Sequence, residues 1–231
     1  MGHKSEFVTC YDTRQPLLSS EAEQCGVTGK YVRPGILEQC AITKSRVLPI
    51  ELERCAATGK RALKRLFVKS SLSEAHILEE VAVRSITGKF CAPIEAKQCL
   101  WSGLKFHPDD LRVCRLTGLP IHFEYATANS NPCLQPLFDL INGNRRTIDE
   151  PQLWNAVSTH VAARLGKGQC RVEAAIISPD RRNLAVSAEV RTLLGFRLRQ
   201  AGLVYSIGDN SVVGRVTQGR RTSEGWIEMK S

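Results

Sequence analysis

The sequence is poor in aromatic residues and methionine, and it has no long apolar run. Phe, Trp and Tyr make up 6% of the 231 residues, and there are 2 Met. No stretch approaches the roughly 18 consecutive apolar residues that a spanning helix requires, so we expect no membrane segment. The N-terminal residues are not followed by the apolar stretch of a secretory signal, so we expect a cytoplasmic protein.

Several catalytic fingerprints are also missing from the sequence. It contains no Walker loop, no glycine fingerprint of a dinucleotide-binding fold, no Gly-x-Ser-x-Gly elbow and no His-Glu-x-x-His motif. Each of these patterns places a nucleophile, a phosphate or a metal at a defined turn or helix. Their absence favours a non-enzymatic protein.

The charge is basic and unevenly distributed. Lys and Arg number 32 against 23 Asp and Glu, which gives a net charge of +9. Residues 145–231 contain 14 Lys and Arg against 8 Asp and Glu and therefore hold +6 of that charge. A basic balance favours polyanionic partners, nucleic acid above all, although a soluble protein with a basic surface has the same composition.

The nine cysteines follow a regular spacing. Neighbouring members of the series Cys10, Cys25, Cys40 and Cys55 are 15 residues apart, as are Cys99 and Cys114. A Thr or Ser stands three residues after each of them, and Gly follows at positions 29, 59, 103 and 118. Two degenerate units bridge the gap in the series, anchored at Ser70 and, after a one-residue deletion, at Arg84. The sequence thus predicts eight units of about 15 residues.

Each unit is expected to hold a Cys-x-x-Thr-Gly turn, a short apolar strand, a Pro, and a helical turn that ends at the next Cys. Gly after Thr supplies the positive φ that closes a tight turn. A unit of this size cannot bury its own apolar face, so the units must stack.

The turn is similar to a zinc knuckle, Cys-x-x-Cys-Gly-Lys, in which Thr has replaced the second Cys. One ligand then remains in each turn, and a tetrahedral zinc site needs four. Cys10, Cys25, Cys40 and Cys55 supply a complete set. A second set keeps Cys99 and Cys114, has Ser70 and Arg84 in place of ligands, and requires completion by Cys91, His107 or His122, with Cys133 a weaker candidate.

Two other interpretations of the cysteines remain open. Free Cys packs as a small apolar side chain, so the repeat can form a metal-free ladder inside a β-solenoid. Disulfides are the third interpretation, but the odd number of Cys and the missing signal favour reduced thiols.

The rest of the chain predicts a small α+β domain. We expect the array over residues 1–126, a linker with a short helix at 134–141 over 127–150, and a basic domain over 151–231. Apolar spacing predicts a helix over 151–165, and β-rich runs predict strands at 171–177 and 184–190. A helix over 191–201 and strands at 203–207 and 212–216 complete an α-β-β-α-β-β order. The expected fold class is α+β.

One pattern in this domain resembles the signature of restriction-type nucleases. Pro179-Asp180 is followed by Glu189-Val190-Arg191, where such nucleases have two carboxylates and a Lys. The resemblance implies a Mg²⁺ held by Asp180 and Glu189, with Arg191 in the position of the Lys. Arg cannot deprotonate to serve as a base, so the match is incomplete.

Basic residues provide candidates for phosphate contacts. They form one stretch in the array and several groups in the C-terminal domain: Lys60, Arg61, Lys64, Arg65, Lys69, Arg181, Arg182, Arg197, Arg199, Arg220 and Arg221.

Three functions follow from these features. The first is a non-enzymatic, zinc-stabilised module that binds nucleic acid or acts as an accessory to a larger assembly. The second is a protein–protein interaction scaffold that uses the surface of the repeats. The third is a Mg²⁺-dependent nuclease built on Asp180 and Glu189.

Overall fold

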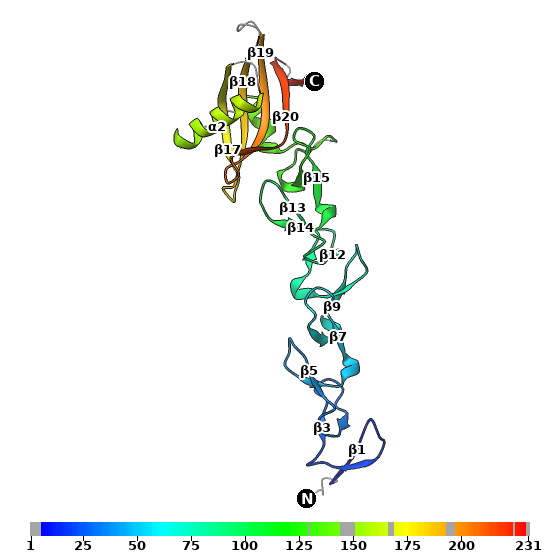
Figure 1. The fold of residues 1–231 in the computed structure, drawn as a ribbon. Coiled ribbons are helices and arrows are strands. Elements are labelled where there is room, and N and C mark those ends of the chain that lie inside the picture. Colours follow the sequence, from blue (N-terminus) through cyan, green and yellow to red (C-terminus); the bar gives the residue numbers. More distant parts are fainter. Residues whose placement is uncertain are drawn as a thin grey trace, which may run out of the picture. The chain divides into compact units, whose positions relative to one another are not determined.

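The computed structural model describes residues 6–128, 130–143, 151–165, 169–192, 197–223 and 225–229. Two helices and many short antiparallel strands make up these residues, so the fold is mixed α+β (Figure 1). The chain divides into two compact units, residues 1–96 and 97–231. None of the helices in the described part of the chain is long and apolar enough to cross a membrane.

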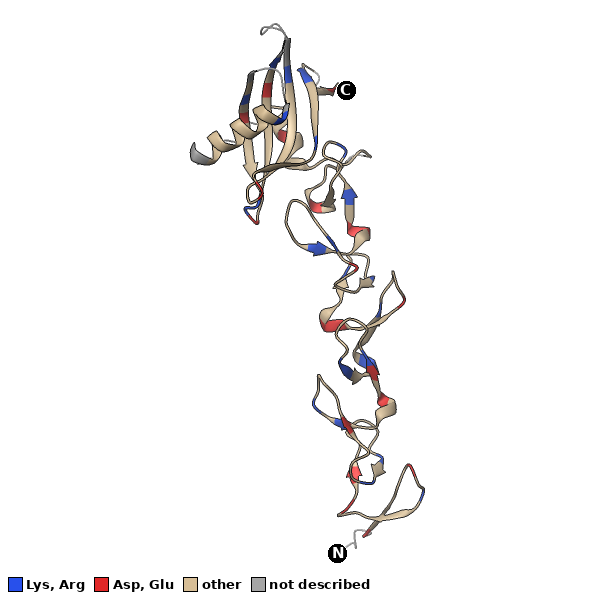
Figure 2. Cartoon of the chain, in the orientation of Figure 1, with Lys and Arg blue, Asp and Glu red and all other residues tan. Residues whose placement is uncertain are grey.

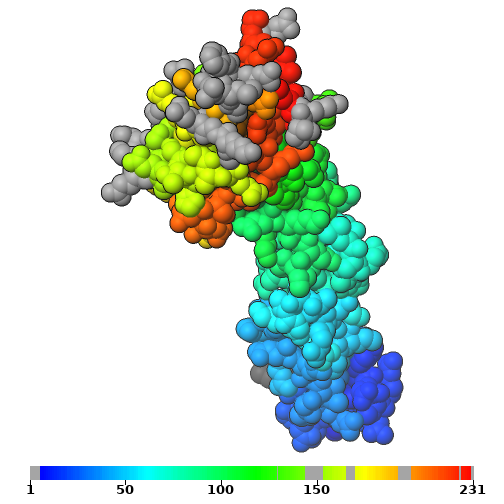
Figure 3. Space-filling model, turned by 45° about the horizontal axis from the view of Figure 1, so that its top comes forward, coloured from blue at the N-terminus to red at the C-terminus, as the bar shows by residue number. Residues whose placement is uncertain are grey.

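The first unit is a succession of two-stranded hairpins. Its strands are β1 (Phe7–Thr9) with β2 (Pro16–Leu18), β3 (Glu23–Gln24) with β4 (Tyr31–Val32), β5 (Glu38–Gln39) with β6 (Arg46–Val47), β7 (Leu52–Arg54) with β8 (Arg61–Leu63), β9 (Phe67–Lys69) with β10 (His76–Leu78), and β11 (Val83–Arg84) with β12 (Phe90–Cys91). Figure 3 shows these hairpins following one another in chain order on the surface of this unit.

The same turn closes all of these hairpins but the one formed by β11 and β12, and it recurs in the second unit. At Cys25 the backbone N–H donates to the carbonyl of Lys30 (2.9 Å), and the Gly29 N–H donates back to the Cys25 carbonyl (2.9 Å). This pair of bonds recurs at Cys10, Cys40, Cys55, Ser70, Cys99 and Cys114. The fourth residue after the anchor has a positive φ even where it is not Gly, as at Lys44 (φ 61°) and Glu74 (φ 63°). The backbone conformation is therefore kept when the Thr-Gly sequence is lost.

The turn between β11 and β12 starts at Ser85, one residue after the predicted anchor Arg84. Ser85 is 3% exposed, and its N–H donates to the Lys89 carbonyl (2.8 Å). The Gly88 N–H then returns to the Ser85 carbonyl (2.9 Å), so the turn is one residue shorter than the others. The deletion lies inside the turn, and Arg84 is the last residue of β11.

Three-residue 3-10 turns connect some of the hairpins: η1 (Pro49–Glu51), η2 (Lys64–Leu66) and η3 (Glu79–Val81). Pro49 begins η1, where its missing N–H is not needed. The chain returns to an extended conformation at Leu52 (φ −100°, ψ 147°), which starts β7. The predicted helical turn ends before the next Cys. A short strand lies between the turn and that Cys, and this strand pairs with the strand that follows the Cys turn.

The second unit begins with two further hairpins. These are β13 (Lys97–Gln98) with β14 (Lys105–Phe106) and β15 (Leu111–Val113) with β16 (Pro120–His122), together with the turns η4 (Pro108–Asp110) and η5 (Phe123–Tyr125). They are followed by helices α1 (Gln135–Ile141) and α2 (Pro151–Leu165). Both helices match the sequence prediction.

A five-stranded antiparallel sheet in chain order completes this unit. Its strands are β17 (Gln169–Ile177), β18 (Asn183–Thr192), β19 (Arg197–Ser206), β20 (Ser211–Thr222) and β21 (Gly225–Glu228). Side chains alternate between the two faces. Ala174, Ala185 and Val204 pack with α1 and the two hairpins, and their sequence neighbours Ala175, Leu184 and Leu203 pack with α2. The hairpins and α2 thus cover opposite faces.

The predicted helix over 191–201 is wrong. In the described residues this stretch lies in strands, where Val190 pairs with Arg199 and Glu189 with Gln200. Burial alternates along β18, with Val190 buried and Arg191 exposed, as a sheet requires. The order in this region is therefore two helices followed by five strands, because pairing with β17 and β20 overrides the local helical pattern. Residues 193–196 lie outside the described residues.

The division at 96/97 differs from the predicted boundary at 126. The hairpins at Cys99 and Cys114 share one apolar cluster with α1 and the sheet. Part of the predicted linker belongs to the same cluster, since Leu137, Leu140 and Ile141 are at most 1% exposed. Residues 144–150 of that linker lie outside the described residues.

The left-handed turn position gives a direct test of this fold. Gly59 has φ +72° and open space around its Cα, so Gly59→Ala introduces backbone strain without a clash. We expect a loss of about 1 kcal/mol in the free energy of unfolding. Lys44→Gly, at the same position of the preceding turn, should be neutral or stabilising by about 0.5 kcal/mol, because relief of strain outweighs the entropy of Gly. Urea denaturation measures both, and an Ala that costs nothing would contradict the left-handed turn.

Candidate functional site

The repeat cysteines lie inside the array at the start of each turn. Cys10, Cys25, Cys40, Cys55, Cys99 and Cys114 are at most 1% exposed. All nine cysteines are free thiols. Their sulfur atoms accept hydrogen bonds from backbone N–H groups, both within the turn and from farther along the chain.

Two kinds of donor meet at the sulfur atoms of Cys10, Cys25, Cys40 and Cys55. Within the turn, the Thr43 N–H donates to Cys40 Sγ (3.4 Å). From the next hairpin, the Leu78 N–H donates to Cys55 Sγ (3.4 Å), and the His122 N–H donates to Cys99 Sγ (3.2 Å) across the same separation of 23 residues. At the end of the series the Leu134 N–H donates to Cys114 Sγ (3.2 Å). The sulfur atoms of the first four cysteines thus fix their own turns and join them to the following hairpin, whereas those of Cys99 and Cys114 make the bond to the following segment.

The same donors change the acidity of the thiols. Hydrogen bonds from the Thr13 hydroxyl and backbone, and from the backbone of Asp12 and Arg33, lower the pKa of Cys10 from 9.0 to about 7. Burial acts to raise the pKa of Cys40, but bonds from Thr43 and from the backbone of Leu63 outweigh it and lower that pKa to about 7. A sulfur that attracts this many donors carries partial negative charge.

Cys25 and Cys55 behave in the same way. Burial opposes ionisation at both, yet hydrogen bonds from Thr28 and Thr58 in their own turns leave the pKa of each thiol below its ordinary value. The backbone of Leu48 and of Leu78, 23 residues farther along, contributes to each shift. In contrast, burial raises the pKa of Cys133 and Cys170, which stand outside the repeat.

In the two turns that start without Cys, a serine is the hydrogen-bond acceptor in place of sulfur. Ser70 Oγ accepts from the N–H groups of Leu72 (3.2 Å) and Ser73 (3.3 Å), and it donates to Glu95 Oε2 (2.6 Å). Ser85 Oγ accepts from the Thr87 N–H (3.2 Å). An oxygen acceptor therefore closes the turn without a thiolate, which explains why these two units keep their shape without Cys.

The structure does not gather the cysteines into a metal centre. Within the described ranges, no group of three or more His, Cys, Asp or Glu side chains lies close enough together to hold a metal ion. The predicted zinc ligands are instead distributed one to a turn, and their acceptor positions are taken up by N–H and hydroxyl donors. The residues present do not fit a tetrahedral zinc site.

The candidates for completing a second zinc site have structural surroundings of their own. His107 is fully buried, and its Nδ1 accepts from the Asp109 N–H (3.1 Å) at the start of η4. His122 stacks on Phe106, with ring centroids 3.9 Å apart, and Phe123 lies against it at 4.3 Å. Cys91 is buried at the end of β12.

Ion pairs join successive hairpins on the outside of the first unit. Arg46 pairs with Glu23 (2.7 Å) and Arg61 with Glu38, and His76 Nδ1 is hydrogen-bonded to Glu53 Oε1 (2.5 Å). All three pairs span 23 residues, as the Cys55 bond does. Exposed pairs of this kind stabilise by at most about 1 kcal/mol each, so they reinforce the register that the sulfur atoms set.

The basic stretch of the first unit is partly used in such pairs. Arg61 is committed to Glu38, and Lys69 to Glu74. Lys60, Lys64 and Arg65 are exposed, and no ion pair within the described residues involves them. Figure 2 shows basic and acidic residues interspersed along these hairpins.

Arg181 and Arg182 lie apart from Arg199 and do not form one patch with it. Arg182 comes directly before Asn183, the first residue of β18, which pairs with Ser206. Arg199 instead pairs with Val190, farther along β18. Seven residues at about 3.3 Å each separate these positions by roughly 23 Å. Arg181 shares the turn of Arg182 and is exposed, as is Arg220 on β20. The side chain of Arg197 lies outside the described residues.

Two arginines of the sheet have defined structural contacts. Arg221 donates to the carbonyls of Ile141 (3.1 Å) and Leu140 (3.4 Å) at the C-terminus of α1. Arg199 lines a cavity of about 540 Å³ with Arg215 and Glu228. Arg221 therefore caps the C-terminus of α1, and its guanidinium is less available for a phosphate contact than those of the exposed candidates.

The proposed nuclease carboxylates do not face a common cation. Asp180 Oδ1 accepts from Ser178 Oγ (2.5 Å) and from the Arg182 N–H (3.1 Å), which closes the β17–β18 turn. Glu189 lies six residues into β18, roughly 20 Å away, and pairs with Arg191 (2.7 Å). The sequence pattern therefore marks a turn and an ion pair, and these two carboxylates cannot share one Mg²⁺.

Sequence reasoning missed the residue at the tip of each turn, two places after the anchor. In the second unit these tips are Trp101 (2% exposed) and Leu116 (0%), and both are packed in the cluster that contains Ala185 and Val204 of the sheet. The carbonyls beside them are also bonded. Asn183 Nδ2 donates to Leu100 (2.8 Å), and the Arg215 N–H donates to Thr117 (3.0 Å).

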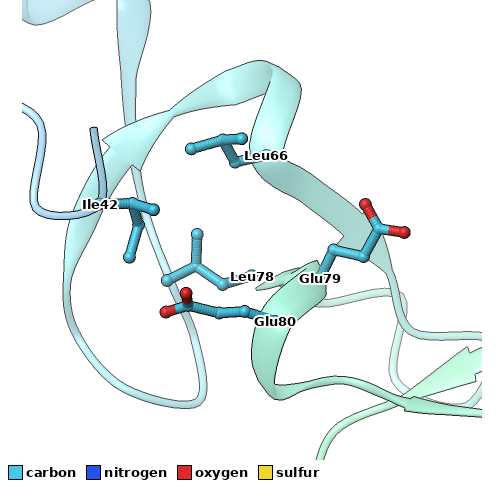
Figure 4. Close-up of a pocket in the computed structure, with 5 residues that line it drawn as sticks. All are labelled: Ile42, Leu66, Leu78, Glu79 and Glu80. Atoms are coloured by element: carbon cyan, nitrogen blue, oxygen red, sulfur yellow. The ribbon is translucent and has the colours of Figure 1, made fainter.

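Two apolar residues at the same tip position are exposed in the first unit. Val27 is 41% exposed and Leu72 is 47% exposed, and both follow their anchor by two residues. Ile42 is half-buried at the rim of a cavity of about 330 Å³ (Figure 4). The sequence contains a pattern that could have indicated these tips, since an apolar residue stands two places after most anchors. Its role as a contact position became apparent only from the packed tips Trp101 and Leu116.

The acceptor role of the anchors predicts a difference between two substitutions. Cys40→Ala leaves the N–H groups of Thr43 and Leu63 without an acceptor and should lower the free energy of unfolding by about 2 kcal/mol. Cys40→Ser keeps an acceptor, as at Ser70, and should cost no more than about 1 kcal/mol. Thermal and urea unfolding measure the difference. Equal damage from both would indicate that sulfur itself, as a metal ligand, is required.

The lowered thiol pKa values also predict a pH dependence of stability. Because the folded pKa of Cys10 and Cys40 is about 7 against 9.0 for an ordinary thiol, the folded chain releases these protons first. The resulting stabilisation is complete above pH 9 and is lost as the pH falls through 7. The urea midpoint under reducing conditions should therefore rise across this window, and the double variant Cys10→Ser, Cys40→Ser should reduce the rise, because Cys25 and Cys55 still contribute to it. A midpoint that falls across the window would contradict it.

Comparison with known proteins assigns no family to this chain. No family model, no curated protein and no solved structure matches it. The functional argument therefore depends on the residues and contacts described above.

Proposed function

We propose that this chain is a non-enzymatic scaffold that binds other proteins through the turn tips of its hairpin array. The observation behind this proposal is the contrast between equivalent tips. Trp101 and Leu116 are buried against the sheet of their own unit, whereas Val27 and Leu72 are exposed. The turn tip packs against the sheet where the sheet is present. Where no such element covers it, the exposed apolar tip is a natural contact point for another protein.

The construction of the array supports this role. The anchors point inward and hold the hairpins together, which leaves the tips on the outside. Repeat arrays that are joined only between neighbours present extended surfaces of this kind to their partners. The carboxylates that motivated a nuclease are separated by roughly 20 Å, so the described residues favour binding over catalysis.

As part of the same proposal, the array consists of eight units of about 15 residues held by hydrogen bonds to sulfur and oxygen. Zinc coordination by Cys10, Cys25, Cys40, Cys55, Cys99 and Cys114 is the alternative that the sequence predicts. The saturation of the sulfur atoms by donors favours the metal-free arrangement.

Nucleic-acid binding is a second candidate, and one observation favours it. Lys60, Lys64 and Arg65 are exposed near η2 without ion pairs among the described residues, so they are available to phosphates. Binding of this kind weakens steeply as salt rises. A labelled duplex and a labelled single strand that both fail to bind at about 50 mM salt would exclude it.

The scaffold is tested by capture of partner proteins on the immobilised full chain after nuclease treatment. Replacing Val27 and Leu72 by Ser should reduce the retained partner about tenfold, because two apolar contacts are lost. Ile50→Ser is the matched control, since Ile50 is 65% exposed in η1 and away from the tips. Equal retention by the tip variant and the control would contradict the proposal.

A further inference from the structure

The cavity beside Ile42 is the most specific feature of the exposed array. Ile42 is a turn tip, Leu66 ends η2, and Leu78 ends β10. Figure 4 shows these three side chains around a common space, with Glu80 extending beneath Leu78 toward Ile42 and Glu79 on the other side of η3. Its volume of about 330 Å³ is at the lower end of ligand sites, so it admits one or two side chains.

The lining of this cavity is apolar with a negative rim. Leu78 is 1% exposed and forms the most deeply buried part of the lining, whereas Glu79 and Glu80 are exposed. No ion pair among the described residues involves either carboxylate. Four other glutamates of the first unit have a basic partner: Glu23, Glu38, Glu53 and Glu74. The lining residues thus carry two negative charges and no positive one.

The second unit shows what docks at an equivalent tip. Leu116 has the same place in its turn as Ile42, and β20 lies beside it. Arg215 of β20 donates from Nε to the Leu116 carbonyl (3.1 Å) and from its other guanidinium nitrogen to the Arg115 carbonyl. Thr217 also donates to Leu116. An extended strand that places Arg215 and Thr217 against the carbonyls of the turn tip therefore lies at this position in the second unit.

We infer that the cavity lined by Ile42, Leu66, Leu78, Glu79 and Glu80 binds an extended segment of a partner protein in which a large apolar side chain is followed by Lys or Arg. The apolar side chain enters between Ile42, Leu66 and Leu78. The cation pairs with Glu80, which extends along the cavity, and the exposed Glu79 adds a second negative charge at the edge. This inference rests on the proposed scaffold function, since it names the partner chemistry at one turn tip.

A pair of short peptides tests the inference on the full chain. One is an acetylated, amidated hexapeptide of sequence Ala-Leu-Lys-Phe-Arg-Ala, and the other has Glu in place of Lys and Arg. Titration followed by amide chemical shifts should show the basic peptide moving the signals of residues 42, 66 and 78–80, with weak binding. The acidic peptide should leave these signals unchanged. Equal binding of the two peptides would overturn the role of the rim.

Variants of the chain separate the two contributions. Glu79→Gln with Glu80→Gln should weaken the basic peptide about fivefold, the sum of two exposed pairs. Ile42→Ser should weaken it about tenfold through lost apolar contact. Glu74→Gln is the control, because Glu74 pairs with Lys69 and does not line the cavity. An unchanged affinity in the double Gln variant, at preserved thermal stability, would contradict the inference.

The outcomes also distinguish this inference from the proposed function. If neither peptide binds while partner capture still depends on Val27 and Leu72, the cavity inference fails and the scaffold stands. If neither peptide binds and capture does not depend on those tips, both fail. If the chain forms a dimer that Ile42→Ser dissociates in sedimentation, the occupant is a second copy and the inference is overturned.

Discussion

The array depends on one interaction, the hydrogen bond from backbone N–H groups to a buried acceptor at the start of each turn. Two-residue strands cannot form a stable sheet alone, and each hairpin lacks a core of its own. A single Cys Sγ accepts from its own turn and from a residue 23 positions farther along. It thereby fixes the conformation of one hairpin and the register of the next. Burial and exposed ion pairs add to this arrangement, but they do not define the turn.

This constraint explains which residues are free to vary. The anchor must accept hydrogen bonds, so Cys gives way to Ser at positions 70 and 85 and the turn persists. The fourth turn position must adopt a positive φ, yet Lys44 and Glu74 show that Gly is not essential. The tips Val27 and Leu72 are exposed. Their apolar character is therefore best understood through what Trp101 and Leu116 do, which is to contact another element.

The parts of the fold that could be predicted were those encoded by local or periodic signals. The 15-residue spacing, the helices at 135–141 and 151–165, and the first β-hairpin of the sheet were visible in the sequence. The region 191–201 was not, since its strands are imposed by pairing with neighbours in the sheet. The anchor at Ser85 was missed because the deletion lies within the turn. At the candidate site, Cys spacing suggested metal ligands, but spacing alone cannot tell whether sulfur atoms face one point or separate N–H donors. The contact role of the tip residues could be recognised only from the structure, in which Trp101 and Leu116 pack against the sheet.

The central claim is that sulfur acts in this array as a hydrogen-bond acceptor and not as a metal ligand. The most direct measurement is zinc per chain, by elemental analysis of the full protein purified without added metal or chelator. The account predicts zinc far below one atom per chain in a folded protein whose nine thiols all titrate after unfolding. One or two zinc atoms bound to each folded chain would contradict it, because four converging thiolates would then replace the separate donor sets seen at each turn.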